Sequence, residues 1–61
     1  MGHEIIGTAT IDGAVTSIRK YNNGFCVVEV NHVVKYSGET IDELIKKMDK
    51  DNIVYKITNE S

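Results

Sequence analysis

The chain contains one cysteine, no proline and no apolar run longer than a few residues. The single thiol of Cys26 cannot close a disulfide within the chain. Together with His3 and His32 it falls short of the four closely spaced ligands of a structural zinc site. The short apolar runs exclude a membrane-spanning helix. Because a free thiol without a secretion signal is typical of a reducing compartment, we expect a cytoplasmic protein without metal or cofactor.

The length of 61 residues is sufficient for one hydrophobic core and too short for two. Hydrophobic residues make up 41% of the chain and charged residues 26%, which are ordinary values for globular proteins and disfavour disorder. No linker rich in Ser, Gly or Pro divides the chain. We therefore expect residues 1–61 to form a single small domain of marginal stability, for which self-association is the remaining source of support.

Turn-forming residues divide most of the chain into runs that predict β-strands. Asp12-Gly13 and Asn22-Asn23-Gly24 are hairpin signals, because Asn, Asp and Gly tolerate the positive φ of such turns. Asn31-His32 is a weaker turn, in which His32 is expected to tolerate positive φ rather than to act as an acid or base. The five expected strands are Glu4–Ile11, Ala14–Tyr21, Phe25–Val30, Val33–Ser37 and Ile53–Thr58.

A helix is predicted between the fourth and fifth strands. Four apolar residues recur there with the 3.6-residue period of one helix face: Ile41, Leu44, Ile45 and Met48. Thr40 followed by Glu43 forms a capping box, in which the hydroxyl and the carboxylate accept hydrogen bonds from backbone amides at the start of the helix. Acidic residues near the beginning and lysines near the end match the helix dipole, so the charged residues form a solvated face.

Pairing across the two hairpins distributes the strand residues between two faces of a sheet. A two-residue turn at Asp12-Gly13 pairs Gly7 with Ile18, and a three-residue loop before Phe25 pairs Ile18 with Val28. The predicted core face contains Ile5, Gly7, Ala9, Ile11, Ala14, Ile18, Cys26, Val28 and Val30. Gly7 and Ala9 are small, so we expect the helix to approach the sheet there. The opposite face contains Ile6, Thr8, Thr10, Val15, Ser17, Arg19, Tyr21, Phe25, Val27 and Glu29.

The last two strands allow alternatives. We expect the fifth strand to lie antiparallel beside the first rather than parallel beside the fourth, because antiparallel pairs are more frequent. For the fourth strand, a three-residue loop at Asn31 places Val34 and Tyr36 in the core, and a two-residue loop turns both outward. The prediction is an α+β fold, β-β-β-β-α-β, with a four-stranded antiparallel meander, one α-helix and a fifth strand, and with the helix packed on one face.

The face opposite the helix is where the sequence indicates a function. One helix covers only one side of a sheet, and an exposed mixture of apolar, aromatic and charged groups is typical of an interaction surface. The alternative is a sheet that closes into a small barrel and buries these groups. We predict a non-catalytic protein–protein interaction module that forms a homodimer, in the manner of a small regulatory or inhibitory accessory protein. Its expected surface consists of Ile6, Val15, Arg19, Tyr21, Phe25, Val27 and Lys35.

Two other partners compete with a second copy of the chain. Binding of another protein is compatible with the same surface. Single-stranded nucleic acid is the alternative function, because aromatic and cationic groups on an open sheet stack bases and neutralise phosphates. A net charge of −2 and a pI near 5.5 disfavour it, since nucleic-acid-binding domains normally carry a basic surface.

An enzyme is not expected. The sequence has no His arranged with a nucleophile, no Gly-rich phosphate loop and no paired carboxylates outside the helix surface. Cys26 is predicted to point into the core as a small apolar side chain, whereas a reactive thiolate needs exposure and a cationic neighbour. We interpret the sequon formed by Asn59, Glu60 and Ser61 as chance.

Overall fold

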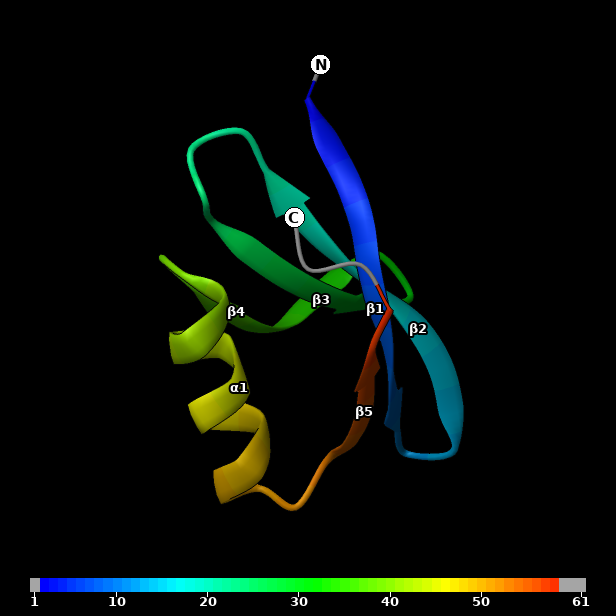
Figure 1. Ribbon diagram of the computed structural model, residues 1–61. Coiled ribbons are helices and arrows are strands. Elements are labelled where there is room, and N and C mark those ends of the chain that lie inside the picture. Colours follow the sequence, from blue (N-terminus) through cyan, green and yellow to red (C-terminus); the bar gives the residue numbers. More distant parts are fainter. Residues whose placement is uncertain (1, 59–61) are drawn as a thin grey trace.

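The computed structural model describes residues 2–58, and in this part of the chain it shows five antiparallel strands and one helix (Figure 1). β1 (His3–Ile11), β2 (Ala14–Tyr21), β3 (Cys26–Val30) and β4 (Val33–Gly38) form a meander, and α1 (Ile41–Lys50) leads to β5 (Val54–Ile57). The strand order is β4-β3-β2-β1-β5. The predicted α+β fold, the element order and the antiparallel pairing of β5 with β1 are confirmed. The sequon at residues 59–61 lies outside the described residues.

The hairpin turns use residues that tolerate positive φ. Asp12 and Gly13 have φ values of 52° and 81°. In the loop before β3, Gly24 has φ 92°, and the Tyr21 amide donates to the Phe25 carbonyl at 2.8 Å, which confirms the three-residue loop. Asn31 and His32 both have positive φ, 54° and 65°, so the expected role of His32 in a turn is confirmed.

The start of α1 follows the predicted capping box. The Thr40 hydroxyl accepts a hydrogen bond from the Glu43 amide at 3.2 Å. The Glu43 carboxylate accepts at 3.2 Å from the amide of Glu39, one residue before the N-cap. Leu44 and Met48 then point toward the sheet and are fully buried.

Two glycines allow close approaches within the fold. A Cβ atom at Gly38 would lie 2.7 Å from the backbone nitrogen of Leu44, so the absence of a side chain at Gly38 lets the helix lie close to the end of β4. A Cβ atom at Gly7 would lie 2.2 Å from the Lys56 carbonyl oxygen of β5. The expectation that Gly7 admits the helix is therefore wrong, because its small size accommodates the neighbouring strand.

The sheet curves around the helix. α1 packs mainly against β4, with fewer contacts to β3 and to β5, which lies at the opposite edge of the sheet. The concave side therefore holds the core, and the convex side, named the outer face below, faces away from α1 (Figure 1). The fully enclosed core consists of Ile6, Ala9, Ile11, Ile18, Cys26, Val28, Leu44 and Met48.

A β-bulge in β1 changes which isoleucine is buried. Ile5 pairs with Arg19 and Gly7 pairs with Ile18, so Ile6 is an extra residue between two consecutive positions of β2. Ile6 is 1% exposed and belongs to the core, whereas Ile5 is 45% exposed. The predictions that Ile5 lies on the core face and Ile6 on the interaction surface are both wrong. Strict alternation along the strand fails because the bulge shifts the register by one residue.

A second bulge decides the face of β4. Val30 pairs with Val33 across the two-residue turn and Glu29 pairs with Val34, but Val28 pairs with Tyr36. Lys35 is the extra residue. Val34 is consequently exposed, as the two-residue loop predicts, whereas Tyr36 returns to the core side and packs against the core. The two-residue loop therefore predicted the position of Val34 correctly, and the three-residue loop predicted that of Tyr36 correctly.

Two tyrosines connect the edges of the sheet to the end of the helix. The Tyr36 hydroxyl on β4 donates to the Asp51 carboxylate at 2.6 Å, and Tyr55 on β5 lies near the carboxylate of Asp49. The hydrogen bond to Asp51, burial and the negative charges of Asp51 and Asp12 raise the pKa of Tyr36. Burial and Asp49 raise the pKa of Tyr55. The protonated phenols therefore stabilise the folded state.

Alkaline pH should destabilise the protein through these phenols. A folded-state pKa above the unfolded value of about 10 gives stability that is fully present below pH 10 and is lost as pH rises through the folded pKa. We expect the melting temperature to fall above about pH 10, and to fall less steeply in Tyr36→Phe, which retains only the contribution of Tyr55. Thermal unfolding followed by circular dichroism at several pH values measures this. An unchanged slope in Tyr36→Phe would contradict the role of Tyr36.

Candidate interaction surface

One end of the outer face is formed by exposed valines. Thr10 pairs with Val15 on one side and with Val54 on the other, so the two valines lie in one row across three strands. Val15 is 72% exposed and Val54 is 71% exposed. Val34, on the edge strand β4, is also exposed, but it pairs with Glu29 and lies one row further along the strands. Val15 and Val54 are named the valine end below.

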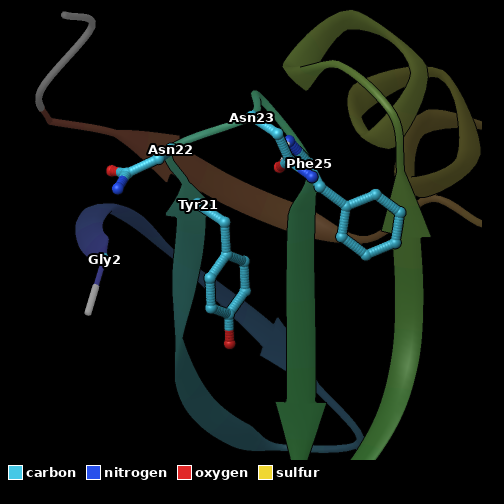
Figure 2. Close-up of a pocket in the computed structure, with 5 residues that line it drawn as sticks. All are labelled: Gly2, Tyr21, Asn22, Asn23 and Phe25. Carbon is cyan, nitrogen blue, oxygen red and sulfur yellow. Dashed lines mark hydrogen bonds between the residues drawn. The ribbon is translucent and has the colours of Figure 1, made fainter.

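The other end of the outer face is aromatic. Figure 2 shows Tyr21 and Phe25 extending from the sheet beside the loop that carries Asn22 and Asn23. These residues and Gly2 line an open pocket of about 390 Å³. The ring of His3 lies 5.6 Å from the ring of Tyr21 at an angle of 54°. His3, Tyr21 and Phe25 are named the aromatic end.

A second pocket adjoins the aromatic end. It has a volume of about 400 Å³ and is lined by Asn23, Phe25, Glu39 and Thr40. The Asn23 side-chain oxygen accepts a hydrogen bond from the Phe25 amide at 3.0 Å, which fixes the loop beside both pockets. Asn23 and Phe25 therefore line both pockets, and an acidic residue, Glu39, lines only the second.

A polar band separates the two ends. The Arg19 guanidinium and the Glu29 carboxylate form an ion pair, with 3.5 Å between Nη1 and Oε1. Thr8 pairs with Ser17 and with Lys56 in the same part of the sheet. The polar band is formed by Thr8, Ser17, Arg19, Glu29 and Lys56. Two exposed apolar residues adjoin it in the same rows, Ile5 beside Arg19 and Val34 beside Glu29.

The predicted surface residues have different environments. Val15 is exposed on the outer face, and Arg19, Tyr21 and Phe25 are partly buried there. Lys35 is exposed, but as the extra residue of the β4 bulge it lines a pocket with Ile11 and Val30 of the core side rather than with the outer-face residues. Val27 is only 6% exposed although it belongs to no core cluster; it pairs with Arg19 and Ser37, which flank it on the adjacent strands. Ile6 is in the core, as described above. The alternative of a closed barrel that buries the outer face is wrong, because its valines are exposed.

Three exposed residues of this face were absent from the predicted surface: Ile5, Val34 and Val54. Val34 is exposed because the turn before β4 has two residues, and Ile5 is exposed because of the bulge in β1. One sequence signal for the bulge exists, since a glycine within a strand often marks a bulge, and Gly7 directly follows the Ile5-Ile6 pair.

Cys26 is fully buried as predicted, and its thiol donates to the Gly24 carbonyl at 3.4 Å. Burial raises the pKa of Cys26, and the nearby charge of Lys20 partly opposes this. Within residues 2–58, no three His, Cys, Asp or Glu side chains are grouped so as to hold a metal ion. The helix in the same residues lacks the length and apolar character needed to cross a membrane.

Comparisons of the chain with protein-family models, with curated proteins and with solved structures find no match. No relative therefore supplies a function. The outer face has to be interpreted from its own residues.

The bulge in β1 can be tested with two neighbouring isoleucines. Ile6→Ala removes a fully buried side chain and should reduce the free energy of unfolding by about 2–4 kcal/mol. Ile5→Ala removes the same atoms from the outer face and should cost less than about 1 kcal/mol. Urea denaturation of both variants measures the difference. Equal losses, or a larger loss for Ile5→Ala, would contradict the register described here.

Proposed function

We propose that the chain is a non-catalytic protein–protein interaction module that forms a homodimer through its outer face. One observation carries this proposal. Of the five large hydrophobic side chains that are exposed among residues 2–58, four lie on the outer face: Ile5, Val15, Val34 and Val54. The fifth, Val33, lies beside the turn between β3 and β4. Such a concentration of exposed apolar groups on one face is typical of a protein interface.

The size of the face supports a weak dimer. The two longest dimensions of the molecule, 28 Å and 22 Å, limit a face to about 600 Å² per chain, and two copies therefore to about 1,200 Å² in total, at the lower end of specific interfaces. The Arg19–Glu29 ion pair in the middle adds a desolvation cost. We expect a dimer that forms and dissociates with concentration, which suits a small regulatory or accessory protein.

Dimerisation would also add stability. A domain of 61 residues has little core to stabilise it, and a partner that binds only the folded state shifts the folding equilibrium toward that state. Two sheets can pack face to face at about 10 Å, which removes their apolar groups from water. The buried, unpaired thiol of Cys26 supports action in a reducing compartment such as the cytoplasm.

The dimer can be tested by placing charge on the valine end. The double variant Val15→Glu/Val54→Glu puts carboxylates into the proposed contact and should raise the dissociation constant by about tenfold or more. Val33→Glu is the control, because it introduces a carboxylate at an exposed valine away from the outer face. Analytical ultracentrifugation between about 10 µM and 1 mM covers the affinity expected for a small interface, and circular dichroism verifies the fold.

Three results would contradict this proposal. The first is a wild-type chain that remains monomeric throughout this concentration range. The second is a dimer that the charged double variant does not weaken. The third is a dimer that Val33→Glu weakens as strongly as the double variant does, because the contact would then lie elsewhere.

Single-stranded nucleic acid is the second candidate, and the aromatic end favours it. Tyr21 and Phe25 line one open pocket and offer ring faces to bases, and Arg19 lies on the same face. Two observations weigh against it. The Arg19 charge is already paired with Glu29, and the adjoining pocket is lined by the acidic residue Glu39, whose negative charge disfavours phosphate.

A titration distinguishes the two candidates. A ¹⁵N-labelled sample receives single-stranded RNA and, separately, single-stranded DNA at low salt, where phosphate contacts are strongest. The homodimer proposal expects the amide signals of Arg19, Tyr21 and Phe25 to remain in place. Saturable shifts of these signals that are lost in Tyr21→Ala would favour nucleic acid instead, and a Tyr36→Phe sample controls for general effects of losing a tyrosine.

A further inference from the structure

The apolar and polar groups of the outer face follow a symmetric order along β2. From one end of the strand to the other, its outward residues are Val15, Ser17, Arg19 and Tyr21. Apolar groups thus occupy both ends and polar groups the middle. A face with this order can pack on a copy of itself that runs in the opposite direction, with apolar ends in contact and polar bands in contact.

We infer that the dimer, whose existence rests on the proposed function, has a two-fold axis that crosses β2 between Ser17 and Arg19. The axis lies in the interface and runs across the strands, so the strands of the two sheets are antiparallel. Val15 of each copy then lies over the partner's Tyr21. The valine end of one chain covers the aromatic end of the other, and each aromatic-end pocket is completed by the partner.

The charges of the polar band favour this axis. The register that pairs Ile18 with Val28 places Ser17 and Glu29 in the same row of the sheet. Because the axis superimposes Arg19 of one chain on the partner's Ser17, each guanidinium lies beside the carboxylate of the partner's Glu29. The two intrachain ion pairs therefore join into a group of two cations and two anions, and each charge is compensated as it is removed from water.

The alternative axis, parallel to β2, brings like groups together. It places Arg19 over the partner's Arg19 and leaves Val15 on the partner's Val15. Two guanidinium groups in direct apposition repel each other. The pocket of about 390 Å³ beside Tyr21 and Phe25 would then meet an identical pocket and remain unfilled, which leaves one end of the interface poorly packed.

The distance between the two ends makes the arrangement measurable. Val15 and Tyr21 are six residues apart on one strand, which corresponds to about 20 Å at 3.3 Å per residue. A probe at position 15 therefore lies close to the partner's Tyr21 with the axis across the strands, and close to the partner's Val15 with the axis along them.

Paramagnetic broadening in a mixed dimer tests this. Val15→Cys chains without ¹⁵N carry a nitroxide and are mixed with ¹⁵N-labelled wild-type chains, so all broadening is intermolecular. Wild-type chains treated with the same reagent are the labelling control, because Cys26 is buried. We expect the amide signals of residues 21–25 to lose more than about half of their intensity, and those of residues 14–16, about 20 Å away along the strand, to retain most of theirs.

A second labelling site is needed in case a nitroxide at position 15 disrupts the dimer interface. Thr10→Cys lies beside Val15 in the β1–β2 register and should broaden the partner's His3, which is beside Tyr21. Ultracentrifugation of each labelled mixture verifies that it dimerises. If it does, and residues 14–16 are broadened most, the inferred axis is wrong and the proposed dimer stands. Broadening confined to α1 would refute the outer face as the interface, and a monomeric wild-type chain would refute both proposals.

Discussion

The structure depends on the packing of one short amphipathic helix into one side of a curved sheet. Leu44 and Met48 are the helical residues that are fully buried, and they complete a core otherwise made by β1, β2 and β3. Gly38 lets the helix approach the end of β4. Tyr36 and Tyr55 connect both edges of the sheet to acidic residues at the helix C-terminus. The curvature of the sheet and the position of the outer face follow from this single contact layer.

The same layer leaves the opposite side of the sheet without a cover. In a larger protein a second helix or sheet commonly fills this position, but here every element among residues 2–58 is already used. The Arg19–Glu29 ion pair lies in the middle of this side, between the valine end and the aromatic end. This order favours the proposed antiparallel contact with a second copy, because Arg19 of each chain would lie beside the partner's Glu29.

Two bulges show where alternation along a strand stops being a guide. Period-2 patterning placed Ile18, Cys26 and Val28 in the core correctly, because β2 and β3 pair there without interruption. It failed at Ile5 and Ile6, where the extra residue of the bulge shifts the strand register by one and exchanges the faces of the two side chains. In β4 a bulge at Lys35 reverses the effect of the two-residue turn, so Val34 and Tyr36 face opposite sides. Part of the predicted surface was therefore correct and part was displaced by one residue.

By itself, the sequence determined the number of elements, the hairpin turns, the helix and its cap, since these depend on positive φ, hydrophobic period and hydrogen bonds between residues close in the chain. It also placed β5 beside β1. Only the tertiary structure decided which residues are exposed on the outer face, because bulge positions depend on cross-strand packing. Gly7, for example, fits against the Lys56 carbonyl of a strand about fifty residues away in the chain, and no local pattern specifies that contact.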